Sequence, residues 1–112
     1  ELASNLGITP HTLAGAGTTQ AAAAAILETL TLATAAGSAD SVRLPATARV
    51  GVPYFVAALG ATALVVWAPV GHSINGTANG KATYSASPGL AIFIRTGATT
   101  WVTQAAVTTT VA

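Results

Sequence analysis

Residues 50–70 read VGVPYFVAALGATALVVWAPV, and the fold class predicted for the chain depends on how this stretch is interpreted. It contains no charged residue, and about 20 apolar residues are enough to cross a bilayer as a helix. However, Pro53 and Pro69 bracket it, Gly60 divides it, and β-branched and aromatic residues crowd both halves. These features favour two β-strands joined by a turn at the glycine, over residues 53–59 and 62–68. A membrane helix is the alternative interpretation of the stretch.

The same succession of short apolar runs and turn residues continues along most of the chain. Further strands are expected at about residues 26–34, 41–45, 81–86, 89–96 and 99–111, after an extended or short helical lead-in at 20–25. No internal repeat of solenoid or propeller spacing is recognised. The pattern predicts an all-β protein, with a small antiparallel sandwich or barrel-like domain over residues 21–112.

Residues 1–20, ELASNLGITPHTLAGAGTTQ, are expected to form an irregular N-terminal arm, because glycines and a proline interrupt them and no period persists. The arm nevertheless carries spaced apolar side chains. Such a segment often becomes ordered only against a neighbour. We therefore predict that the arm docks on a neighbouring molecule through Leu2, Leu6, Ile8 and Leu13.

The composition also predicts association. The chain has 112 residues, of which 52% are hydrophobic and only 6% are charged. Charged residues usually make up about 25% of a domain, and one of this size has a modest core, so apolar surface is left for a partner. A homo-oligomer or a subunit of a larger assembly is expected. The strand predicted at 62–68 is apolar on both faces, which makes Val65 and Trp67 candidate interface residues.

Several function classes are disfavoured by residue content. The net charge of +1 comes from scattered residues, without the clustered Lys and Arg that nucleic-acid binding needs. There is no cysteine, and the two histidines and three acids show no metal-ligand spacing. A Ser73–His72–Asp40 arrangement can be drawn, but adjacent residues on a strand point to opposite faces and no nucleophile elbow is present. No phosphate loop is complete. We expect no catalytic, metal or cofactor site, no enzyme activity and no nucleic-acid partner.

The most polar stretch, GHSINGTANGK at 71–81, invites a functional reading. Its two Asn-Gly pairs are strong turn signals, because Asn and Gly tolerate a positive φ. We expect a compact loop or very short hairpin, attached to the core by Ile74 and exposed to solvent at its tip. In this interpretation His72 is a surface loop histidine, not a catalytic base.

The order of three blocks carries a family resemblance: ADSVRLP at 39–45, GATALVVWAPVGHSING at 60–76 and AIFIRTGATTWVT at 91–103. Together they resemble small β-rich virion proteins of tailed bacteriophages, including head-decoration (cement) proteins and fibre-like appendages. The chain departs from that pattern at His72, where an acidic residue fits better. The matching residues are Val42, Leu44, Pro45, Gly60, Ala61, Ala63, Leu64, Val66, Pro69, Gly71, Ile74, Asn75, Gly76 and Trp101.

The resemblance covers residues 38–103 and implies a role without chemistry. A decoration protein sits on the capsid exterior as a homo-oligomer, commonly a trimer, with the major capsid protein as its partner. The chain would be made in the host cytoplasm and end in the virion. The alternative within the same resemblance is a fibre or adhesion module that binds host-surface glycans. Trp67, Trp101 and the 71–81 loop would be its contacts.

Overall fold

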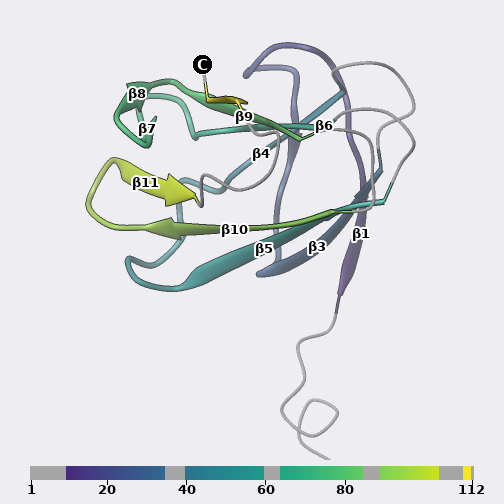
Figure 1. Cartoon of the computed structure of the whole chain (residues 1–112), viewed down its shortest axis with the longest axis horizontal. Helices are drawn as coiled ribbons and strands as arrows, with labels where there is room; N and C mark the ends of the chain where they lie inside the picture. The colour runs from purple at the N-terminus through teal and green to yellow at the C-terminus, as the bar shows by residue number, and fades with distance from the viewer. Residues whose placement is uncertain (1–9, 35–39, 60–63, 85–88, 104–109, 112) are drawn as a thin grey trace, which may run out of the picture.

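The computed structural model describes residues 10–34, 40–59, 64–84, 89–103 and 110–111, and within them the chain is all-β, without a helix. The strands form two sheets (Figure 1). In spatial order, sheet A contains β1 (His11–Ala14), β3 (Leu30–Thr34), β5 (Pro53–Ala58), β10 (Gly89–Arg95), β11 (Thr100–Thr103), β7 (Ser73–Ile74) and β8 (Thr77–Ala78). Sheet B contains β12 (Thr110–Val111), β9 (Lys81–Tyr84), β6 (Leu64–Trp67), β4 (Ser41–Arg43) and β2 (Ala24–Ala25).

The first half of the chain winds like a solenoid. From β1 to β6 it alternates between the sheets, and successive strands within a sheet pair in parallel, β1–β3–β5 on one side and β2–β4–β6 on the other. His11 lies opposite Thr31 and Leu30 opposite Phe55, so a turn takes about 20–25 residues, a period found in repeat proteins. The sequence does not reveal this period, because the turns follow similar paths in space without sharing a residue pattern.

The second half reverses direction and adds antiparallel strands. β9 pairs with β6, and β10 pairs with both β5 and β11. The all-β prediction is therefore confirmed, whereas the purely antiparallel arrangement is wrong: both sheets are mixed. Their solenoid-like arrangement replaces the expected sandwich or barrel. Figure 1 shows β3, β5 and β10 in one layer, with β4, β6 and β9 in the other.

Residues 50–70 form two strands, as expected, but the two strands do not form a hairpin. β5 lies in sheet A and β6 in sheet B, so they do not pair with each other. The predicted turn at Gly60 lies outside the described residues. In the described part of the chain, no helix is long and apolar enough to span a membrane.

The core lies between the two sheets. Because side chains alternate along a strand, every second residue of β3, β5, β10 and β11 faces sheet B. The largest fully buried side chains are Trp101 and Phe93, and Tyr54 meets Trp101 edge-on with ring centroids 6.0 Å apart. Small buried residues on the central strands leave room for these rings: Ala33, Ala58, Ala82 and Ala91.

The irregular arm expected over residues 1–20 is wrong for residues 11–14. These residues form β1, and Leu13 packs against the core instead of reaching outward. The chain that follows is held by sheet B: Ser41 Oγ donates to the carbonyls of Ala16 and Gly17, and Arg43 Nη1 donates to the carbonyl of Gln20 at 2.8 Å. The other predicted anchors of the arm lie outside the described residues: Leu2, Leu6 and Ile8.

The remaining predicted strands are present with shifted ends. The lead-in at 20–25 is extended at its end, as β2, and the strand expected at 26–34 begins only at Leu30. The long strand expected at 99–111 is described as two short ones, β11 and β12, in different sheets.

Candidate functional site

The outer side of sheet A, facing away from sheet B, is apolar across its four central strands. Register places Leu30, Phe55 and Ile92 in one row across β3, β5 and β10, and Leu32, Ala57 and Leu90 in the next. A third row runs from Pro53 through Ile94 to Val102 on β11. We call this surface the sheet A outer face; its residues are Leu30, Leu32, Pro53, Phe55, Ala57, Leu59, Leu90, Ile92, Ile94 and Val102.

Three of these side chains are strongly exposed: Leu90 is 56% exposed, Leu59 48% and Val102 42%. The others are half-buried, because neighbours across the strands cover one another. The ten residues include no charged and no hydrogen-bonding side chain. A contiguous apolar face of this kind usually marks a contact surface.

The local sequences PYFVAA and GLAIFIR explain why this face forms, because β5 and β10 are apolar on both sides. One side fills the core through Val56, Ala91 and Phe93, and the other side is left outward. A strand with two apolar sides lies between two layers in most proteins. Here only one of those layers is supplied by the described part of the chain.

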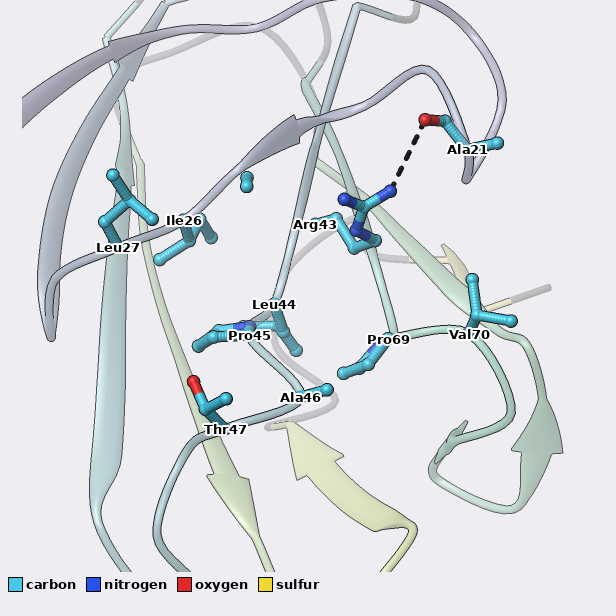
Figure 2. A pocket seen from close by; sticks show the side chains of 11 residues that line it. Ala21, Ile26, Leu27, Arg43, Leu44, Pro45, Ala46, Thr47, Pro69 and Val70 are labelled. Atoms are coloured by element: carbon cyan, nitrogen blue, oxygen red, sulfur yellow. Dashed lines mark hydrogen bonds between the residues drawn. The ribbon is translucent and has the colours of Figure 1, made fainter.

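A second apolar surface is a groove of about 480 Å³ where the chain passes from sheet B towards sheet A (Figure 2). Leu27 and Val70 stand at its two sides and are the most exposed large apolar side chains, at 70% and 69%. Arg43 forms part of its wall and points to the carbonyl of Ala21. The remaining lining is Ala25, Ile26, Leu44, Pro45, Ala46, Thr47 and Pro69.

The two interface residues predicted on β6 lie on the side of sheet B away from the core. Val65 is only 4% exposed, which leaves little of it for a partner. Trp67 is half-buried, and Lys81 Nζ lies 5.2 Å from its ring centroid, within the range of a cation–π contact. The indole Nε1 of Trp67 has no hydrogen-bond partner among the described residues. An interface role for this pair stays a prediction.

The 71–81 stretch forms the expected very short hairpin, β7 and β8. Asn75 and Gly76 make its turn, with φ of 48° and 86°, and Ile74 is fully buried beneath it. Asn75 is also tied to β11: its Oδ1 accepts from the Thr103 amide at 3.0 Å, and its Nδ2 donates to the Thr103 carbonyl at 3.3 Å. Side-chain bonds therefore reinforce the turn.

The interpretation of His72 as a surface histidine is wrong. It is 8% exposed, and Trp101 Nε1 donates a hydrogen bond to its Nδ1 at 3.1 Å. Burial, together with the positive charge of Arg95, lowers the pKa of His72. Trp101 itself is 1% exposed and packs in the core. A sugar ring could not stack on it, which removes one proposed glycan contact.

The His72–Trp101 pair does not resemble an active site. No nucleophile is hydrogen-bonded to the imidazole in the described structure, and its Nδ1 is already occupied by the indole. The residues described also contain no group of three His, Asp or Glu side chains that could hold a metal ion. The hydrogen bond between His72 and Trp101 connects the loop before β7 to β11.

Comparison with protein-family models, curated proteins and solved structures finds no match to this chain.

The sequence predicts apolar contact residues on β6, and the described structure shows a second, broader apolar surface on sheet A. The sequence carries the signal for that surface as well. Residues 53–59 and 89–94 carry apolar side chains at both alternating positions, as residues 64–67 do. Choosing among them required the strand order, because Phe55 and Ile92 become neighbours only through pairing of β5 with β10.

Proposed function

We propose that this protein is a non-enzymatic structural subunit that works by burying apolar surface in an assembly. The observation that carries the proposal is the sheet A outer face. Its ten apolar residues lie on β3, β5, β10 and β11, except for Leu59, which follows β5. Burying apolar area contributes about 25 cal/mol per Å² before the entropic cost of association is subtracted. Such a contact needs no reactive group, which agrees with the residue content.

The kind of assembly follows from the sequence. Residues 38–103 resemble virion proteins of tailed phages, and on that basis we propose a decoration protein on the capsid exterior. Its partners are further copies of itself, in a trimer, and the major capsid protein. The observed structure is compatible with this role through its all-β fold and its uncharged outer face.

The glycan-binding alternative has less support. Trp101 is buried and Trp67 is half-buried beneath Lys81, so neither ring presents a free stacking surface. A carbohydrate site usually offers an exposed aromatic ring beside hydrogen-bonding groups. We therefore do not propose it as a second function.

The proposal is tested by measuring the native mass of the purified protein and its co-sedimentation with capsid shells that lack it. A homo-oligomer that saturates the shells and raises their melting temperature is the expected result. A protein that stays monomeric and does not bind shells at micromolar concentration contradicts the proposal. The mass also tests the predicted trimer directly.

A further inference from the structure

We propose that the sheet A outer face packs against the same face of another copy of this chain. This inference rests on the proposed apolar assembly and names the partner of its contact surface. A face that packs on the same face of another copy joins two subunits, so the inference predicts a dimer where the sequence resemblance implies a trimer. Two β-sheets pack face to face with their backbones about 10 Å apart and their side chains interdigitated. The rows around Phe55 would supply one layer, and the same rows of the neighbouring copy the other.

The absence of charge on this face restricts the partner. Burying an unpaired charge costs several kcal/mol, so the face excludes partner surfaces that carry Lys, Arg, Asp or Glu at their centre. Charged residues make up about 25% of an average protein sequence, and they lie mostly on the surface. The surface known to be free of charge over a matching area is the face itself: its ten residues are apolar, and charged residues make up only 6% of the chain.

The dimensions of the face also suit such a contact. β3, β5, β10 and β11 contain 5, 6, 7 and 4 residues. At about 4.8 Å between strands and about 3.3 Å per residue, they cover roughly 350 Å². A stable interface buries about 800 Å² per partner, with an apolar core and a polar rim. The face therefore has the size of the core of an interface. Thr12 on β1, Thr34 on β3 and Thr100 on β11 border it as polar rim residues.

Contact through the faces fits better than contact through the sheet edges. Edge-to-edge pairing needs a long strand with free backbone groups. Sheet A ends in β8, which has two residues, and in β1, which has four and follows Pro10. Sheet B ends in β2 and β12, each with two residues. The broad surface that the described structure offers is the face.

The test compares two carboxylate substitutions by native mass spectrometry and sedimentation. Phe55→Asp places a charge at the centre of the face, and Thr12→Asp places the same charge at its rim, on β1. The central charge should weaken self-association roughly 100-fold or more, because it is buried without a partner. The rim charge should change it less than about threefold, because it stays in water. Leu90→Asp, at an exposed position, repeats the test with less risk to folding.

A second measurement does not depend on destabilisation. The chain has no cysteine, so Ala57→Cys introduces a single thiol in the middle of the face. A short bismaleimide should join two copies through it, and Ala22→Cys, on an exposed loop beside sheet B, should not react between copies. A cross-linked pair shows that two copies meet at this face, and the native mass gives the number of copies in the assembly.

The outcomes separate this inference from the proposed function. An oligomer that survives both Phe55→Asp and Leu90→Asp, with no cross-link through Ala57→Cys, assembles through another surface and overturns the inference alone. A monomer that binds shells through this face also overturns it, because the occupant is then the shell. A monomer that binds no shell contradicts both proposals.

Discussion

The indole of Trp101 donates its Nε1 hydrogen to Nδ1 of His72 across 3.1 Å, inside the protein. Because Nδ1 accepts this bond, the imidazole is neutral and carries its proton on Nε2. The bond joins β11 to the loop that leads into β7, at the point where these two strands pair in parallel. The buried hydrogen bond between Trp101 and His72 therefore forms only while Nδ1 of His72 is unprotonated.

This dependence predicts acid sensitivity. The pKa of His72 is lowered by burial and then by the charge of Arg95, whereas the unfolded chain titrates at the ordinary value of 6.5. The unfolded state thus takes up the proton more readily. The stability that this residue contributes is complete above pH 6.5 and is lost as the pH falls through the lower folded pKa. Urea unfolding between pH 8 and pH 4.5 measures it.

The matched variant for this prediction is His72→Asn, whose amide oxygen can accept the indole hydrogen but does not titrate in this range. Its stability should fall less between pH 7 and pH 5 than that of the wild type. Equal pH profiles for the two proteins would mean that His72 plays no part in acid unfolding. Comparing the two profiles removes contributions from every other titrating group.

Substitutions at the two turn residues, Asn75 and Gly76, should destabilise the fold for different physical reasons. Gly76→Ala adds a methyl group that meets no atom within 4 Å but forces alanine into a φ of 86°, which should cost about 1–2 kcal/mol. Asn75→Gly keeps the positive φ available and loses both bonds to Thr103, at about 1–3 kcal/mol. Asn75→Ala should cost more than either, and denaturant unfolding ranks the three. A harmless Asn75→Ala would show that this turn contributes little.

The same hairpin shows what could be read from the sequence. The Asn75–Gly76 turn was predictable because its cause is local: both residues tolerate a positive φ. The burial of His72 was not, because its sequence neighbours Gly71 and Ser73 are polar or small. Its partner Trp101 lies 29 residues further along the chain. Burial that depends on residues far apart in the sequence cannot be predicted from local sequence patterns.

Sheet pairing follows the same rule. The strands at 53–59 and 62–68 were predicted from their β-branched and aromatic residues and from the breaks at Pro53, Gly60 and Pro69, which are local properties, and β5 and β6 confirm them. Their assignment to one hairpin failed because β5 pairs with β3 and β10, through contacts such as Leu30 with Phe55. Parallel pairing depends on crossover connections through the other sheet, which no pair of neighbouring runs reveals. The sheet A outer face therefore emerged only with the strand order.

We predict that the Arg95 guanidinium stabilises the fold through hydrogen bonds that a lysine side chain cannot make. Its Nη1 donates to the carbonyls of Ala46 and Ala48 at 3.0 and 2.6 Å, its Nε donates to Gly97 at 3.0 Å, and its Nη2 donates to Ala98. The guanidinium thus connects the segment before β5 to the β10–β11 turn. A lysine ammonium lacks this planar fork of donors.

Arg95→Lys should therefore cost about 2–3 kcal/mol, since hydrogen bonds to a charged group contribute about 1.5–3 kcal/mol each. Arg49→Lys is the matched control, because Arg49 is exposed. The change should be close to zero there, and thermal unfolding of the two variants gives the comparison. Equal melting temperatures for the two variants would show that water replaces the guanidinium at no cost.

We predict that residues 1–9 are needed for binding to capsid shells but not for folding of the β domain. β1 begins at His11 and Leu13 belongs to the core, so a deletion that tests the arm must stop before them. Removing residues 1–9 should abolish binding to capsid shells and leave the melting temperature nearly unchanged. Removing residues 1–14 should also lower stability, because it takes an edge strand from sheet A.

A substitution variant keeps the length of the arm and tests its apolar side chains alone. With Leu2, Leu6 and Ile8 all changed to serine, shell binding should fall as far as in the deletion, because the contact depends on apolar burial. Undiminished binding by both variants would place the shell contact on the β domain. The groove beside Leu27 and Val70 would then be the surface to examine, since these side chains are the most exposed of the large apolar residues.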